Sequence, residues 1–145
     1  MASFRFRVDN VLGWYRKQSE LEKERLSTCL ANLNAAREAR TCLELERARI
    51  EQEVIAQTSL PATDLSALGL YRLRAKKRHL EFTEEIQRLQ LAAAEQTRKY
   101  IEAQRRQKLV EQLRERRRVE HVYAENRELE SMAGEAYLGQ WSRAK

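Results

Sequence analysis

Hydrophobic side chains recur along most of the chain at alternating steps of three and four residues, the spacing of a coiled-coil seam. The first series consists of Leu12, Tyr15, Ser19, Glu22, Leu26, Cys29, Leu33, Ala36, Arg40, Leu43, Arg47, Ile50, Val54 and Gln57. The second series consists of Leu65, Leu68, Arg72, Ala75, His79, Phe82, Ile86, Leu89, Ala93, Gln96, Tyr100, Ala103, Gln107 and Val110. Each series predicts a long helix with one covered face.

The segment between the two series contains the single proline of the chain, Pro61. Proline cannot continue a helix that precedes it, and Thr63 or Asp64 is expected to cap the next helix. The pattern therefore predicts an all-α fold in which two long helices form an antiparallel coiled-coil hairpin. We expect one domain with a helix over about residues 8–57, a turn over 58–63, a helix over about 64–133 and a tail over 134–145.

Reflection through Pro61 pairs every position of one series with a position of the other. The predicted layers include Val54 with Leu68, Leu33 with Leu89, Glu22 with Tyr100, and Leu26 with Gln96. Polar positions fall opposite apolar ones, so no layer is expected to bury two polar groups. Periodicity alone leaves a homodimeric coiled coil open, but the mirror registration favours a hairpin within one chain. Such a chain should be monomeric or weakly associating, and should melt at low temperature because polar layers weaken its seam.

Composition argues against a catalytic domain. Charged residues make up 34% of the chain, so too few apolar side chains remain to enclose a broad core. The sequence contains no phosphate-binding Gly-x-x-x-x-Gly-Lys loop, no Gly-x-Ser-x-Gly elbow, and no cysteine placed beside a histidine. We therefore expect a non-enzymatic protein without a cofactor.

The cysteines and histidines do not indicate a metal or redox site. Cys29 and Cys42 fall on one predicted helix, about 20 Å apart at 1.5 Å per residue, which is too far for a disulfide. His79 and His121 each lack a second ligand at helical spacing, so no metal site is expected. No stretch is apolar enough to span a membrane, and no signal-peptide core is present, so we expect a cytosolic protein.

Positive charge gathers in two segments of the second predicted helix. Residues 98–118 carry nine basic residues against three acidic ones, a surplus equal to the +6 net charge of the whole chain. Residues 72–78 contain no acid. Such runs usually form a solvated helix face, and binding to nucleic acid is an alternative. The interleaved Glu111, Glu115 and Glu120 disfavour nucleic acid, because DNA-binding basic helices concentrate their positive charge.

The apolar stripe changes face beyond residue 118. Val119, Val122, Leu129 and Ala133 repeat at heptad-like spacing, but two residues out of frame with the seam. Two residues turn a helix by about 200°, so this stripe is expected to point away from the hairpin. An outward-facing apolar stripe next to a run of arginines suggests contact with another molecule.

The two ends of the sequence carry distinctive segments. The opening Phe4-Arg-Phe-Arg-Val-Asp-Asn-Val-Leu12 leads into a charged helix, and near the other end Gln112-Leu-Arg-Glu-Arg-Arg-Arg-Val-Glu120 is rich in arginine and glutamate. Both segments resemble the flagellar FliJ family of the type III export apparatus, whose C-terminal helix is also rich in arginine and glutamate. One departure is Ser131-Met-Ala-Gly-Glu135, where the family often has Leu-Asp-Glu.

The resemblance implies a stalk protein that inserts into the hexameric flagellar export ATPase and stimulates it. It also implies contact with the export gate membrane protein and with export chaperones, with no specific nucleic acid. The protein would then be cytoplasmic and peripheral at the inner face of the cell membrane through its partners. The stalk of a non-flagellar type III secretion system and a nucleic-acid-binding coiled coil are the alternatives.

The charge pattern and the resemblance together indicate three groups of site residues. The expected contact with the ATPase ring consists of Arg105, Arg106, Arg114, Arg116, Arg117, Arg118, Val119 and Val122. Phe4 and Phe6 reflect onto the same region, and are expected to brace the arginines. The patch expected to face the export gate or a chaperone consists of Arg72, Arg74, Lys76, Lys77 and Arg78.

Overall fold

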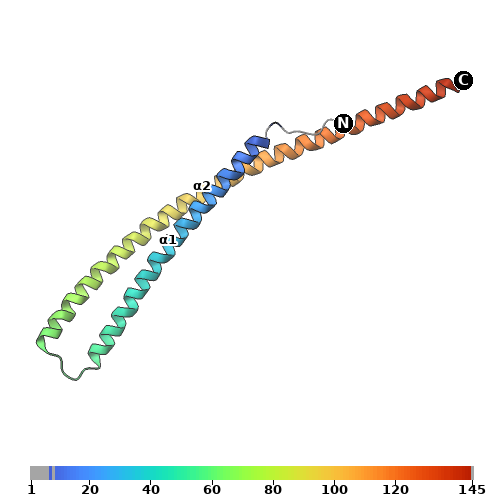
Figure 1. The fold of residues 1–145 in the computed structure, drawn as a ribbon. Helices are drawn as coiled ribbons and strands as arrows, with labels where there is room; N and C mark the ends of the chain where they lie inside the picture. Colours follow the sequence, from blue (N-terminus) through green and yellow to red (C-terminus); the bar gives the residue numbers. More distant parts are fainter. Residues whose placement is uncertain (1–6, 8, 145) are drawn as a thin grey trace. The chain divides into compact units, whose positions relative to one another are not determined.

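The chain folds into two long helices joined by a short turn (Figure 1). The computed structural model describes Arg7 and residues 9–144, and all regular structure within them is α-helical. Helix α1 spans Asp9–Ile55, with 47 residues, and helix α2 spans Ala62–Arg143, with 82 residues. The predicted all-α class with two long helices is confirmed.

The turn follows from the chemistry of Pro61. The carbonyl oxygen of Pro61 accepts hydrogen bonds from the amides of Asp64 and Leu65, at 3.1 and 3.2 Å. Pro61 is therefore the residue that caps α2, and the prediction that Thr63 or Asp64 caps this helix was wrong. Proline suits the position before the first helical residue because it has no N–H that needs a partner there, while its carbonyl oxygen still accepts the first bonds of the helix. Asp64 lies in the first turn, where its negative charge interacts favourably with the positive end of the helix dipole.

The contacts divide the described chain into two units, each built from parts of both helices. The turn unit is Leu21–Tyr100, and it contains the turn. The terminal unit contains the described residues up to Glu20 together with those from Ile101 onward.

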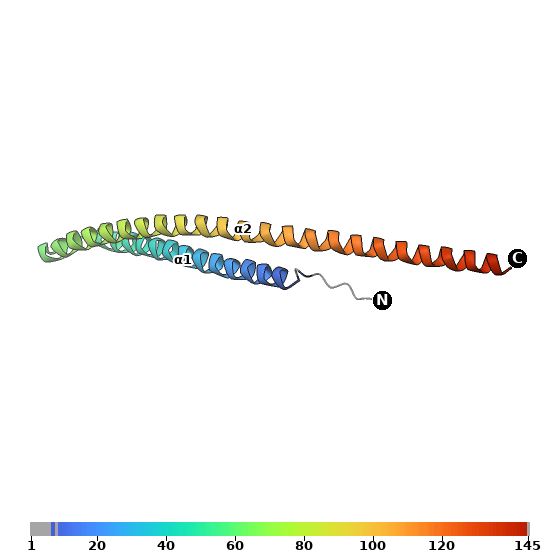
Figure 2. The ribbon, with the colours of Figure 1, turned by 90° about the horizontal axis from the view of Figure 1, so that it is seen from above.

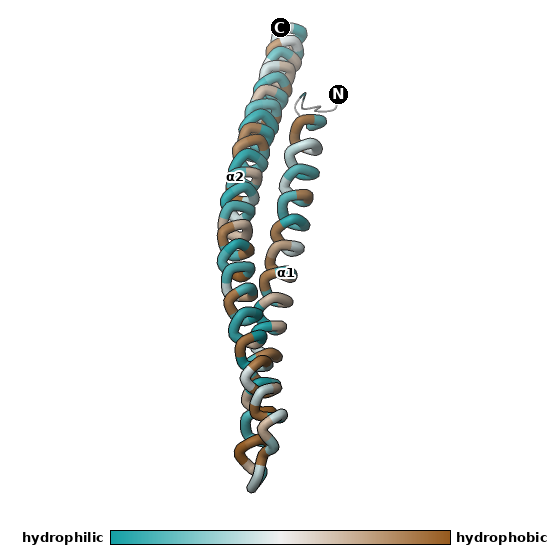
Figure 3. The backbone as a smooth tube through the Cα atoms, turned by 90° about the vertical axis from the view of Figure 1, so that its left-hand side faces the viewer, coloured by the Kyte–Doolittle hydropathy of each residue, from teal (hydrophilic) through white to brown (hydrophobic). Residues whose placement is uncertain are grey.

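The seam of the turn unit is the predicted one. Its buried residues all lie on the two predicted series, and they are Leu33, Leu68, Ala75, Ile86, Ala93 and Gln96. Apolar and polar residues alternate along both helices (Figure 3). Two cross-helix pairs join positions nearly equidistant from Pro61: Arg72 Nε lies 2.9 Å from Glu51 Oε1, and His79 Nδ1 lies 3.3 Å from Glu44 Oε1. The helices therefore run antiparallel in this unit.

One layer of the turn unit differs from the prediction. Gln96 is 9% exposed, and its side-chain amide donates hydrogen bonds to the carbonyl oxygen of Glu22, at 3.2 Å, and to the Glu22 carboxylate. This pair was not predicted, but it does not bury two polar groups, because Glu22 is only half-buried. The pair is tolerated because each group satisfies the other, and Arg25 also pairs with Glu22 at 3.0 Å.

The terminal unit contains the end of the hairpin contact. Leu12 and Ser19 of α1 are buried there, and both are predicted seam positions. Arg16 Nε lies 3.6 Å from Glu111 Oε1, and Asp9 Oδ1 lies 2.9 Å from Arg114 Nε. Asp9 is the first residue of α1, so α2 from Glu115 onward extends past it (Figure 2). No described residue from Gln112 to Ala144 is buried.

Helix α2 is longer than the sequence suggested. It ends at Arg143, so the predicted helix end at residue 133 and the predicted tail over 134–145 were wrong for the described residues. Gly134 and Gly139 each lower helix stability by about 1 kcal/mol relative to alanine, which favoured an early end. Neither glycine adopts a positive φ, so both continue the helix. The positive charge of Arg143 in the last turn interacts favourably with the negative end of the helix dipole.

Candidate partner-binding surfaces

The arginines expected to contact the ATPase ring all lie on α2 in the terminal unit. They are exposed, as the sequence predicted for a surface that meets another molecule. Some of these arginines form ion pairs or hydrogen bonds within the chain and others do not. Those without such a bond are available to a partner.

Arg114 and Arg118 already have partners. Arg114 joins α2 to Asp9 of α1, so it contributes to the contact between the helices. Arg118 binds Glu115 within α2, with Nη2 2.7 Å from Oε1 and Nε 3.1 Å from Oε2. This hydrogen bond holds the pKa of the Glu115 carboxyl below its usual value, with further lowering from the charges of Arg118 and Arg114. The same pair raises the pKa of Arg118.

The remaining arginines of the expected ring contact are uncommitted, meaning that they form no ion pair or hydrogen bond with another described residue. Among the residues that the structure describes, no acceptor lies within ion-pair or hydrogen-bond distance of Arg105, Arg106, Arg116 or Arg117. Arg116 and Arg117 also lie past Asp9, the first residue of α1. These two guanidinium groups can therefore bind a partner's carboxylates without first breaking an internal pair.

Apolar side chains accompany these arginines along the extension of α2. Val119 is 55% exposed and Val122 is 42% exposed, so neither packs against α1. Sequence reasoning missed several exposed residues farther along, because it assigned them to a tail: Tyr137, Leu138 and Trp141. The signal was present, since Ala133, Tyr137 and Trp141 follow one another at steps of four residues. The other residues expected nearby, Phe4 and Phe6, lie outside the described residues.

The second basic patch lies on α2 in the turn unit. None of its five residues is buried, and two of them have partners within the chain. Arg72 pairs with Glu51 of α1, while the Arg78 guanidinium lies 5.8 Å from the centre of the Phe82 ring. Arg74, Lys76 and Lys77 form no ion pair or hydrogen bond with any other described residue.

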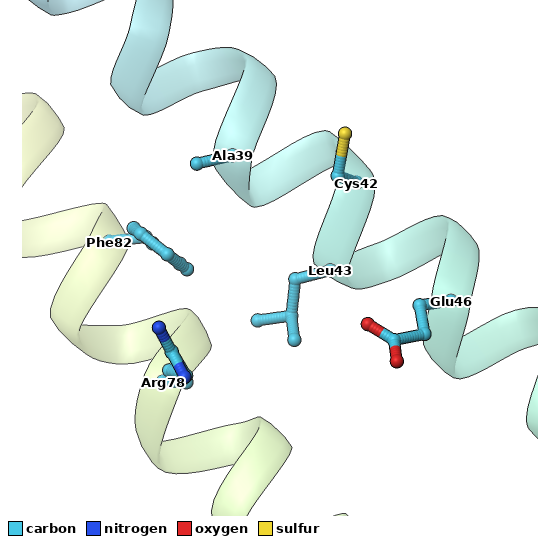
Figure 4. A pocket seen from close by; sticks show the side chains of 6 residues that line it. All are labelled: Ala39, Cys42, Leu43, Glu46, Arg78 and Phe82. Atoms are coloured by element: carbon cyan, nitrogen blue, oxygen red, sulfur yellow. The ribbon is translucent and has the colours of Figure 1, made fainter.

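A hollow of about 350 Å³ lies beside this patch, between the two helices. It is lined by Ala39, Cys42, Leu43, Glu46, Arg78 and Phe82. Leu43 and Phe82 point toward each other from opposite helices, and Arg78 lies next to the Phe82 ring (Figure 4). The hollow is open to solvent, so it could receive a side chain of a partner, but it would not exclude water from a reaction.

The histidines and cysteines lie apart from one another. His79 faces Glu44, and His121 Nδ1 lies 3.7 Å from Glu125 Oε1. Cys29 and Cys42 are free thiols on α1. Within the described part of the chain, no three histidine, cysteine, aspartate or glutamate residues are placed to hold a metal ion. Neither helix, over its described residues, is long and apolar enough to cross a membrane.

Comparison of the chain with protein-family models, with curated proteins and with solved structures gives no match. The likeness to the FliJ family therefore rests on the two sequence segments described above.

Proposed function

We propose that this chain is a non-enzymatic stalk or coupling protein of the flagellar type III export apparatus. In this proposal it inserts into the hexameric export ATPase, stimulates it, and links it to the export gate and to export chaperones. It acts in the cytoplasm, peripheral at the inner face of the cell membrane through these partners. The observation that carries the proposal is the extension of α2 past α1, which exposes Arg116, Arg117, Val119 and Val122 on a single helix.

The extension of α2 suits a ring-shaped partner in both its width and its charge. A single helix is about 10–12 Å across with its side chains, which is narrow enough to enter the central opening of a ring-shaped protein. Uncommitted arginines attract an acidic surface over long range, and so guide the helix into place. Glu115 and Glu120 interrupt the positive charge, which limits how firmly any one position is held. The valines can then bury apolar surface against the ring.

The turn unit supports a second contact. Arg74, Lys76 and Lys77 are exposed there without partners among the described residues, next to the hollow lined by Leu43 and Phe82. A basic patch beside a partly apolar hollow fits an acidic protein segment that carries a hydrophobic anchor. In the proposal this surface faces the export gate or a chaperone.

The experiment that tests this function measures ATP hydrolysis by the flagellar export ATPase of the same organism with and without the chain. We expect stimulation that weakens as salt is raised, because exposed charges are screened. The Arg116→Glu/Arg117→Glu variant should lose most of the stimulation. It should keep its helicity by circular dichroism, because neither arginine supports the fold through an ion pair with another described residue.

The matched control is Arg74→Glu/Lys77→Glu, which reverses two equally uncommitted charges in the turn unit. It should stimulate normally. If the control variant no longer stimulates the ATPase while the Arg116→Glu/Arg117→Glu variant stimulates it normally, the ring contact belongs to the turn unit instead. Duplex DNA in a mobility-shift assay at the same salt tests the alternative class. Tight DNA binding without any effect on the ATPase would refute the export function.

A further inference from the structure

The extension of α2 belongs to a longer surface stripe, here called the outward stripe, which runs along the face opposite the seam. Its members follow one another at steps of three or four residues: Ile101, Arg105, Leu109, Gln112, Arg116, Val119, Tyr123, Asn126, Glu130, Ala133, Tyr137 and Trp141. Ile101 lies two residues from the seam position Ala103, so it is turned from the seam by about 200°. The large apolar members are exposed by 42% at Ile101, 66% at Leu109, 69% at Tyr123 and 56% at Trp141.

Charge is segregated along this stretch of α2. Residues 98–118 carry the surplus of six positive charges described above, whereas residues 119–143 carry five glutamates against two arginines. The same helix therefore has a basic half and an acidic half. A second copy of the chain placed antiparallel along it would lay each basic half against an acidic half.

The outward stripe is also symmetric about the level of residue 121. Reflection there gives three apolar layers, Ile101 with Trp141, Leu109 with Ala133, and Val119 with Tyr123. It gives three polar layers as well, Arg105 with Tyr137, Gln112 with Glu130, and Arg116 with Asn126. In these layers the Arg105 guanidinium can lie on the Tyr137 ring, and the Gln112 amide can donate to the Glu130 carboxylate. The Arg116 guanidinium can donate to the amide oxygen of Asn126. A two-fold axis repeats all six layers.

A parallel arrangement on the same stripe is disfavoured. In register, it would place Arg105 on Arg105, Arg116 on Arg116 and Glu130 on Glu130, and like charges facing each other repel. The charges therefore select the orientation, while the apolar residues provide the surface to bury. A different protein as occupant would not require this internal symmetry.

We propose that the outward stripe binds a second copy of this chain in an antiparallel, two-fold symmetric contact centred near residue 121. The interface would run from Ile101 to Trp141, about 60 Å at 1.5 Å per residue. It leaves the seam with α1 intact, because the stripe lies on the other face of α2. The proposal concerns the isolated chain and does not rest on the export function.

The test uses sedimentation equilibrium of the full chain over a concentration series. We expect a reversible monomer–dimer equilibrium. Gln112→Lys places a positive charge opposite Glu130 twice in each dimer, and should tighten dimerisation roughly fivefold. Gln112→Glu places a negative charge there and should weaken it by a similar factor. Gln90→Glu changes an exposed glutamine of α2 outside the stripe, and should leave the equilibrium unchanged.

The opposite signs expected at position 112 distinguish an antiparallel contact from a parallel one. In a parallel dimer residue 112 would face itself, so lysine and glutamate would both weaken association. A chain that stays monomeric at every concentration, or variants that change in the same direction, would overturn the proposal.

Disulfide trapping tests the register directly. In a Cys29→Ser/Cys42→Ser background, chains carrying Gln112→Cys are mixed with chains carrying Glu130→Cys and gently oxidised. The proposed register brings positions 112 and 130 of different chains within disulfide reach, and keeps the two residues 112 about 27 Å apart. An excess of mixed dimers supports the register. An excess of dimers linked through 112 and 112 refutes it.

Discussion

Neighbouring arginines of the terminal unit have identical side chains but differ in whether they bind a carboxylate of the chain. Arg114 holds Asp9 of α1, Arg118 holds Glu115, and Arg116 and Arg117 have no partner among the described residues. The cluster itself could be predicted from composition, because four arginines lie within five positions. Their division could not, since it depends on where α1 begins and on which rotamers bring a carboxylate within reach.

The pairing of Glu115 with Arg118 gives a prediction at the same scale. Removing the guanidinium in Arg118→Gln should raise the pKa of Glu115 toward its ordinary value, because the hydrogen bond from Arg118 is the largest cause of the lowering. The pKa of Glu85, lowered in the same way by Arg88, should not change and serves as an internal control. A carboxyl-carbon NMR titration of both residues measures this. An unchanged Glu115 would show that the pair does not persist in solution.

The sign of any effect on stability follows from that direction. A folded-state pKa below the unfolded value stabilises the protein at pH values above the unfolded pKa, and this stabilisation is lost as pH falls through the folded pKa. Glu115 is fully exposed, so solvent and salt screen most of the effect. The NMR titration is therefore a better measure of the pair than a melting curve.

At the scale of the helices, the seam was the most predictable feature. Steps of three and four residues located the buried residues of both units, because a side chain can be covered only where the helix meets its partner. The polar pair of Gln96 and Glu22 was not predicted, since reflection through Pro61 placed each of them opposite a different residue. The two residues lie about one helical turn apart in that register, and the Gln96 side chain reaches across to Glu22, which periodicity alone does not show.

The seam makes a quantitative prediction. Leu33 is 5% exposed, and Leu33→Ala should lower the free energy of unfolding by about 2–3 kcal/mol, through lost burial and the cavity left behind. Leu45 lies on the same helix but is 66% exposed, so Leu45→Ala should change the free energy of unfolding by less than about 0.5 kcal/mol. Urea unfolding followed by circular dichroism measures both. Equal losses in the two variants would contradict the assigned seam.

For the molecule as a whole, the two proposals draw on overlapping residues. Arg105, Arg116 and Val119 belong both to the expected ring contact and to the outward stripe. A second copy bound there would cover the surface that the ATPase needs. Self-association and ATPase binding should therefore exclude each other, and their balance should depend on the concentration of the chain.

This competition can be measured with the variants at position 112, a residue outside the expected ring contact. At high chain concentration, Gln112→Lys should stimulate the ATPase less than the unmodified chain does, because more of it is held in dimers. Gln112→Glu should stimulate more, for the opposite reason. At low concentration all three chains should converge, because dimers dissociate and the ring contact is the same in each. Stimulation that differs equally at every concentration would mean that residue 112 acts on the ATPase directly. Identical stimulation throughout, with dimers present by sedimentation, would show that the ring and the second copy bind different faces of α2.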